Sequence, residues 1–172
     1  MKNVLIVVDM QNDFINMALG TKEAEKTVQP VIDLINDEQF DTVIATMDTH
    51  GTDYMETYEG KYLPVIHCVK DTEGWQINAE VNEALKKRNA IIIEKPTFGS
   101  EKLIELLKSE KPESLTFCGL CTDICVISNC LMARAALNGT PMSVVKNACA
   151  GVTPAKHEAA LDVLASCQFE IK

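Results

Sequence analysis

Short apolar runs alternate with longer amphipathic stretches along this chain. Five of the runs are rich in β-branched residues, as expected of strands that are buried on both faces. They are Val4–Val8, Thr42–Met47, Ala90–Glu94, Ser114–Gly119 and Met142–Lys146. Pro64–Cys68 is predicted to be a further short strand, and Gln168–Ile171 a last edge strand.

The stretches between these runs have apolar residues at helical spacing. One carries Val28, Ile32 and Ile35 on a single face, with Pro30 expected near its start or at a kink. Further helices are expected over 77–87, 100–109, 122–138 and 157–166. This alternation predicts a three-layer α/β/α fold with a doubly wound, mainly parallel sheet of about six strands. No repeat or linker interrupts it, so we expect a single domain over residues 1–172.

Composition narrows the function classes. The chain has 172 residues, of which 47% are hydrophobic and 24% charged, as in globular proteins. A net charge of -9 without any Lys/Arg cluster argues against nucleic-acid partners and anionic membrane surfaces. The first apolar run meets Asp9 too early for a signal peptide or a membrane span. With no export signal, the seven cysteines are expected to be reduced thiols of a cytoplasmic protein.

Polar residues stand where the predicted strands end. In doubly wound sheets, ligands bind in the crevice beyond the carboxyl ends of the strands. We therefore expect the residues at these ends to share one crevice: Asp9, Asp48, His50, His67, Lys95, Cys121 and Cys125.

Three cysteines lie close together at positions 118, 121 and 125. A zinc site would need a second pair of ligands, and an iron–sulfur cluster would need a fourth cysteine, so we do not expect a metal at these cysteines. Cys118 is expected to pack within its strand, and Cys121 to lie at a turn. If Thr122 caps the following helix, Cys125 lies in its first turn, where the helix dipole favours a thiolate nucleophile. Free amides of the same turn could hold an oxyanion. Cys125 could also be an ordinary small hydrophobe in the core.

Asp9 and Lys95 could assist such a nucleophile. An aspartate near a thiol can take its proton and later return one to a leaving amine. Lys95 could hold this aspartate in place and balance negative charge. The alternatives are a turn-capping aspartate and a solvated surface lysine.

Asp48, His50 and His67 form the ligand pattern of a metal that remains open to substrate. The alternative is that both histidines are ordinary loop or core residues.

Several stretches together resemble one family, the isochorismatase-like cysteine hydrolases, and within it the nicotinamidases. They are VVDMQNDF (7–14), TMDTH (46–50), PVIHC (64–68), EKPTFGS (94–100) and, most specifically, GLCTDICV (119–126). The resemblance implies the isochorismatase-like hydrolase fold and a catalytic triad of Asp9, Lys95 and Cys125. It also implies an oxyanion hole from the backbone amides of Cys121 and Cys125, with a cis peptide bond before Cys121.

The same resemblance implies a divalent metal on Asp48, His50 and His67, zinc in the first place and iron or manganese as alternatives. It implies that Phe14 and Leu120 contact the substrate.

In this chain, one position departs from the nicotinamidase pattern. Nicotinamidases have a second ring-clamping aromatic residue before the last metal histidine, where this chain has Leu63 or Pro64. That leaves Tyr62 and Trp75 as candidates for the clamp.

The function expected is hydrolysis of a small amide, with release of ammonia through a thioester intermediate. Two alternatives stay open: hydrolysis of another C–N or ester bond, such as that of an N-carbamoyl compound, and a non-enzymatic thiol-based binding or redox-sensing role. The resemblance also implies a homo-oligomer.

Overall fold

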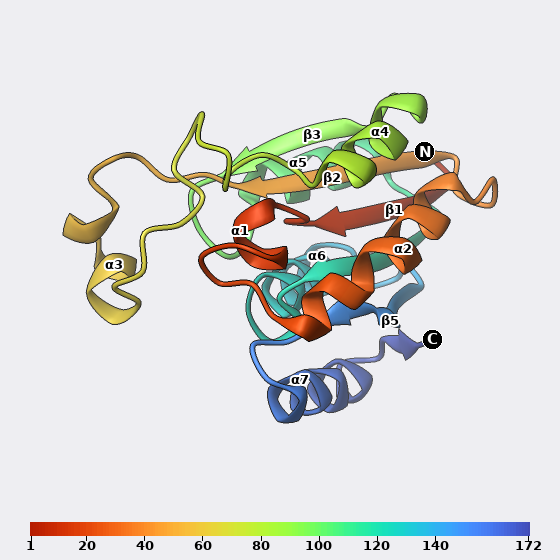
Figure 1. Cartoon of the computed structure of the whole chain (residues 1–172). Helices are drawn as coiled ribbons and strands as arrows, with labels where there is room; N and C mark the ends of the chain where they lie inside the picture. Colours follow the sequence, from red (N-terminus) through yellow and green to blue (C-terminus); the bar gives the residue numbers. More distant parts are fainter.

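The computed structural model describes residues 1–172, and its six strands form one sheet in the order β3-β2-β1-β4-β5-β6 (Figure 1). All neighbouring strands run parallel. The strands are β1 (Asn3–Val8), β2 (Thr42–Asp48), β3 (Ile91–Lys95), β4 (Ser114–Leu120), β5 (Met142–Ala150) and β6 (Glu170–Ile171). The sheet therefore has the predicted doubly wound, parallel order.

Helices cover both faces of the sheet and make the three predicted layers. α2 and α4 pack side by side on one face, and α5 packs beside α6 on the other, with α7 next to α6 (Figure 1). The helices are α1 (Asn12–Ile15), α2 (Lys22–Asn36), α3 (Tyr58–Tyr62), α4 (Ala79–Lys87), α5 (Glu101–Glu110), α6 (Ile127–Ala136) and α7 (Pro154–Ser166). Two short turns accompany them, the 3-10 turn η1 (Tyr54–Glu56) and the π turn η2 (Thr122–Val126). None of the helices combines the length and the apolar composition that a membrane span requires.

Local capping residues set where most of the helices begin. The side chains of Thr21, Asn78, Ser100 and Thr153 accept hydrogen bonds from the first N–H groups of α2, α4, α5 and α7. Pro30 lies inside α2, so the expectation that it stands near the start of that helix is wrong. The helix begins at the cap that Thr21 provides, well before the proline.

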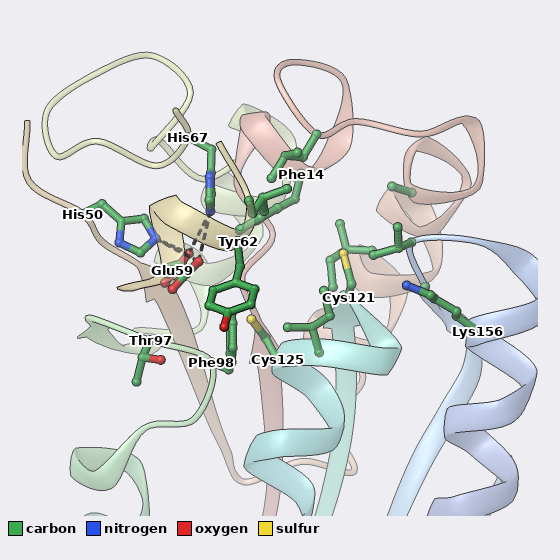
Figure 2. Close-up of a pocket in the computed structure, with 18 of the residues that line it drawn as sticks. Phe14, His50, Glu59, Tyr62, His67, Thr97, Phe98, Cys121, Cys125 and Lys156 are labelled. Atoms are coloured by element: carbon green, nitrogen blue, oxygen red, sulfur yellow. Dashed lines mark hydrogen bonds and ion pairs between the residues drawn. The ribbon is translucent and has the colours of Figure 1, made fainter. Parts of the chain in front are cut away.

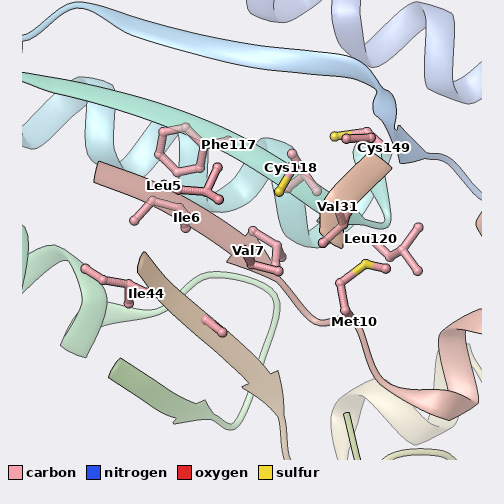
Figure 3. Close-up of a cluster of buried hydrophobic side chains, with 14 of the residues drawn as sticks. Leu5, Ile6, Val7, Met10, Val31, Ile44, Phe117, Cys118, Leu120 and Cys149 are labelled. Carbon is pink, nitrogen blue, oxygen red and sulfur yellow. The ribbon is translucent and has the colours of Figure 1, made fainter. Parts of the chain in front are cut away.

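β1 and β4 lie at the centre of the sheet and pair along their whole length, from Asn3 with Ser114 to Val8 with Gly119. Gly119 has a φ of +112°, and a Cβ atom there would overlap the backbone of Val8. The close approach of the two strands therefore requires glycine. Apolar side chains of these strands fill the core on both faces of the sheet (Figure 3). The connections leave β1 and β4 toward opposite edges, so the crevice of a doubly wound sheet opens at their carboxyl ends.

A long excursion, residues 49–78, separates β2 from α4 and holds η1 and α3. Pro64–Cys68 lies in it and is not a strand, contrary to expectation. It is followed only by an isolated bridge between His50 and Val69. Cys68, at the end of this segment, adopts a left-handed φ of +46°, which is outside the conformation of a strand. The N–H of Cys68 is bound by the Asp13 carboxylate rather than by a strand.

Candidate active site

Three buried side chains meet at the carboxyl end of the sheet. Lys95, the last residue of β3, reaches across β2 to Asp9, which follows β1. Its Nζ atom lies 2.7 Å from Asp9 Oδ2 and 3.6 Å from Cys125 Sγ. It also donates a hydrogen bond of 2.9 Å to the carbonyl oxygen of Thr97. The structure thus brings together an acid, a cation and a thiol, although Asp9 and Cys125 are more than a hundred positions apart in the sequence.

Burial dominates the protonation of this group. It raises the pKa of the Cys125 thiol well above its usual range, and the neighbouring Asp9 carboxylate adds to the effect. Burial also raises the pKa of Asp9, although Lys95 opposes that shift. The direction of the Cys125 pKa shift favours the thiol over the thiolate that is expected at a helix start.

Thr46 is a further member of this group that sequence reasoning missed. Its Oγ1 donates a hydrogen bond of 2.6 Å to Asp9 Oδ1, the oxygen that Lys95 does not hold. Thr46 is buried in the middle of the sheet, in an otherwise apolar part of β2. A lone hydroxyl in a buried strand is the signal that could have identified it, because such a group needs a partner. The two contacts fix both oxygens of the Asp9 carboxylate.

The turn after β4 presents Cys125 to the crevice. The peptide bond between Leu120 and Cys121 is cis, as the resemblance implies. The carbonyl oxygen of Cys121 accepts from the N–H groups of Ile124 and Val126, whereas its own N–H donates to no group of the chain. That free N–H is available to a ligand. The turn is a π turn with Cys121 at its cap position, so Thr122 does not cap the helix as expected. Its hydroxyl instead pairs with His157 Nδ1 of α7, at 2.8 Å.

Asn129 ties this turn to the loop that follows Lys95. Its side-chain amide donates to the carbonyl oxygens of Cys125 and Phe98, at 2.8 and 3.1 Å, and its Oδ1 accepts from the N–H of Ser100 at 3.0 Å. It is completely buried in α6. The thiol and the lysine are therefore held by one continuous network, and Asn129 is a residue that sequence reasoning did not identify.

A second polar cluster adjoins this group. The predicted metal ligands Asp48, His50 and His67 meet, and Glu59 of α3 joins them. Asp48 Oδ2 lies 3.0 Å from His50 Nε2 and 3.6 Å from His67 Nε2. One potential ligand atom from each of the four residues lies within 4.8 Å of all the others. Two imidazoles and two carboxylates at this spacing suit zinc, iron or manganese.

The geometry of both histidines favours a metal. His67 bonds the carbonyl oxygen of Val65 through Nδ1 at 2.8 Å, which leaves Nε2 facing the cluster as a free ligand atom. The ring of Tyr54 packs against both imidazoles, with centroids 4.7 Å from His50 and 4.9 Å from His67, and this tyrosine is only 1% exposed. The imidazole orientations are thus set before any ligand arrives.

Two buried polar residues form hydrogen bonds with the backbone at or next to the cluster residues, and neither was expected. The Oε1 atom of Gln11 accepts a hydrogen bond of 2.7 Å from the N–H of Asp48. Its Nε2 atom donates to the carbonyl oxygens of Asp48 and Trp75, at 2.8 and 2.9 Å. Asp13 accepts the N–H of Cys68 at 2.7 Å, next to His67. Both belong to the stretch VVDMQNDF, where they could have been read as polar residues that a buried turn must satisfy.

One cavity of about 670 Å³ connects the thiol to the metal-type cluster (Figure 2). Cys125, Cys121 and the four cluster residues line it, and so do Phe14 and Leu120, as expected. Three more aromatic residues, Tyr58, Tyr62 and Phe98, line it. Trp75 does not, because its indole Nε1 donates instead to Thr49 Oγ1 at 2.9 Å. Of the two candidates for a second ring clamp, only Tyr62 reaches the cavity.

Comparison with known proteins gives consistent matches. The family model for the isochorismatase domain matches residues 3–171. A nicotinamidase of Schizosaccharomyces pombe is 27% identical over 209 aligned residues, covering 97% of this chain and 91% of that protein. The crystal structure of a nicotinamidase/pyrazinamidase from Bacillus subtilis superposes with a TM-score of 0.87 at 26% identity, over 99% of each chain. A pyrazinamidase from Pyrococcus horikoshii, solved in complex with zinc, gives 0.81 at 25% identity, over 100% of this chain and 99% of that one.

Proposed function

The chain belongs to the isochorismatase family, and from that premise we propose that it is a nicotinamidase-like amidohydrolase that releases ammonia from a pyridine carboxamide through a thioester on Cys125. It is a hydrolase of carbon–nitrogen amide bonds. One observation carries the substrate proposal: a single cavity joins the buried thiol to a cluster of metal-ligand type. A pyridine carboxamide has an electrophilic carbonyl for the thiol and a ring nitrogen for a metal.

The first half of the reaction forms the thioester. Asp9 takes the thiol proton of Cys125, and the sulfur attacks the amide carbonyl carbon. The raised pKa of the thiol supports a base of this kind, because an unassisted thiol would stay protonated. The C–N bond then breaks, and Asp9 returns the proton to the nitrogen, which leaves as ammonia.

The second half hydrolyses the thioester. Asp9 takes a proton from a water molecule, the resulting hydroxide attacks the carbonyl carbon, and the C–S bond breaks. The carboxylate product leaves, and the thiol recovers its proton. Lys95, at 2.7 Å from Asp9 and 3.6 Å from Cys125, keeps the carboxylate in place and balances the charge of the departing sulfur.

The oxyanion formed in both halves is assigned to the backbone amides of Cys121 and Cys125. The Cys121 N–H is free of partners within the chain, so it can donate to a ligand without first breaking a bond. A preorganised donor of this kind is worth about 2.7–4 kcal/mol of transition-state stabilisation.

Asp48, His50, Glu59 and His67 would hold a divalent metal, and zinc is the first choice for this donor set. The zinc-bound pyrazinamidase of Pyrococcus horikoshii supports that choice. When bound, the metal would act as a Lewis acid toward the ring nitrogen of the substrate. Phe14, Tyr62 and Phe98 would contact the ring in the same cavity.

The substrate is tested by ammonia release from three amides of matched size: nicotinamide, its ring-carbon analogue benzamide, and an N-carbamoyl compound. We expect nicotinamide to be preferred over benzamide by kcat/KM, because only nicotinamide offers a ring nitrogen. Equal rates for the first two would remove the role of the ring nitrogen. Preference for the N-carbamoyl compound would replace the substrate class.

A further inference from the structure

α3 is set apart from the body of the molecule. It lies on the excursion between β2 and α4, clear of the sheet (Figure 1), and its main packing partner is the adjacent turn η1. Despite this position, α3 supplies three residues to the lining of the cavity, Tyr58, Glu59 and Tyr62. In a helix, residues three positions apart lie on the same face, so fixing one of them restrains the other.

Glu59 links α3 to the metal-type cluster. Its Oε1 atom lies 3.7 Å from Nε2 of both His50 and His67, and its side chain is 17% exposed. It also lies within 4.8 Å of the Asp48 carboxylate. Two carboxylates at this distance repel each other, and Lys95 Nζ, at 3.5 Å from Asp48 Oδ1, offsets only part of that charge. The hold of Glu59 on the body therefore depends on the charge that the cluster contains.

Tyr62 has no comparable hold of its own. Its side chain lines the cavity (Figure 2), yet the residue is 76% exposed. Its hydroxyl has one partner, the hydroxyl of Tyr58 at 3.3 Å, which belongs to the same short helix and is itself exposed. Nothing in the body of the protein fixes this ring directly.

Assuming the metal centre of the proposed function, we propose that Glu59 is a positioning residue that couples metal binding to the aromatic wall of the cavity. With the cation bound, Glu59 holds α3 against the body and keeps Tyr62 in the wall of the cavity. Without it, the repulsion between Glu59 and Asp48 releases α3, and the wall on that side opens.

The segment around α3 stays attached at both ends when Glu59 loses its contact with the metal-type cluster. The fully buried Tyr54 donates from its hydroxyl to the carbonyl oxygen of Leu63 at 2.9 Å, and Thr57 caps the N–H of Gly60. The change is therefore local to residues 57–63, and a variant of Glu59 retains the fold. This makes the proposal accessible to hydrogen exchange.

The test compares amide hydrogen exchange of residues 57–63 with and without zinc, in the parent and in Glu59→Gln. Glu56→Gln is the matched control, since Glu56 is an acidic residue of the neighbouring turn and outside the cluster. We expect zinc to slow exchange in the parent and in Glu56→Gln by about tenfold or more, with a ceiling of about 100-fold at zinc 100 times above its dissociation constant. Glu59→Gln is expected to bind zinc through the other three ligands, with weaker affinity, and to show no zinc-dependent slowing.

Two results would overturn the coupling: exchange in the parent that zinc leaves unchanged, or Glu59→Gln protected by zinc as strongly as the parent. If Glu59→Gln binds no zinc, the comparison of the parent with and without zinc decides. None of these measurements involves substrate, so their failure is distinct from a failure of the proposed activity.

A double-mutant cycle on KM gives an independent readout. Glu59→Gln and Tyr62→Ala are each expected to raise KM more than they lower kcat, because both remove the same wall. The double variant is then expected to resemble Tyr62→Ala alone. Strictly additive effects of the two changes would show that Glu59 does not act through Tyr62.

Discussion

The Nζ atom of Lys95 lies 2.7 Å from Oδ2 of Asp9, and both residues are completely buried. The pair spans three neighbouring strands, because β2 separates the strand that ends in Lys95 from the strand that precedes Asp9. A charge in this position is tolerated only with its partner, so each residue depends on the other.

Replacing Lys95 by Met is expected to destabilise the fold by about 3–5 kcal/mol, because it leaves the Asp9 carboxylate buried without a counter-charge. Urea unfolding monitored by circular dichroism measures the change. Lys146→Met is the control: it breaks the exposed pair with Glu158, which lies at 2.8 Å, and is expected to change the unfolding midpoint little. Equal destabilisation by the two variants would contradict the buried pairing of Lys95.

Thr46→Val is expected to lower kcat by on the order of ten- to a hundredfold, because hydrogen bonds to charged groups contribute about 1.5–3 kcal/mol. The lost bond is the one of 2.6 Å to Asp9. Thr46→Ser keeps the hydroxyl and is expected to restore kcat, whereas Thr116→Val, a buried threonine bonded to Ser143, is expected to leave kcat unchanged. A Thr46→Val enzyme with the kcat of the parent would remove Thr46 from the site.

Gly119→Ala is expected to destabilise the protein by more than about 3 kcal/mol, which is the upper end of the usual range for a single substitution. The new Cβ would overlap the backbone of Val8, and the φ of +112° is unfavourable for alanine. Gly139→Ala is the control, since a Cβ there meets nothing within 4 Å. Thermal unfolding measures both. A Gly119→Ala protein as stable as Gly139→Ala would mean that β1 and β4 do not approach as described.

Alkylation of Cys125 by iodoacetamide is expected to accelerate with pH up to pH 9 without levelling off. The thiol pKa is raised by burial and by Asp9, so the thiolate fraction keeps growing over this interval. Asp9→Asn removes one of the two carboxylates that raise this pKa, the other being Asp48, and is expected to increase the rate at neutral pH. Peptide mass spectrometry follows Cys125 separately from the other six cysteines. A rate that is already constant near pH 7 would indicate a resting thiolate and contradict this description.

The sheet and its edge could be predicted from the sequence for a simple reason. Asp9, Asp48 and Lys95 each end or directly follow an apolar run, and parallel strands bring such positions to one edge. Cys125 follows from the same rule, because only Cys121 separates β4 from the turn η2 that contains it.

Other features depend on contacts that a local pattern does not contain. Glu59 lies on a five-residue helix within a long connection, where no periodicity indicates which side chains turn toward the cavity. Thr122 has the residue type of a helix cap, but its hydroxyl is taken by His157 from a distant helix. Pro64–Cys68 has strand composition, yet it is not a strand, and the N–H of Cys68 is bound by the carboxylate of Asp13. In each case a tertiary contact outweighs the local preference.

The role of Cys125 as the nucleophile is tested most directly by the rate of ammonia release from nicotinamide, measured for the parent protein and for Cys125→Ala. Cys167→Ala serves as the control, because Cys167 lies at the end of α7 and outside the cavity. The thioester mechanism predicts that Cys125→Ala loses at least about a thousandfold in kcat, as expected when a covalent nucleophile is removed, and that Cys167→Ala retains the parent's rate. Ammonia release by Cys125→Ala at the rate of the parent would contradict it.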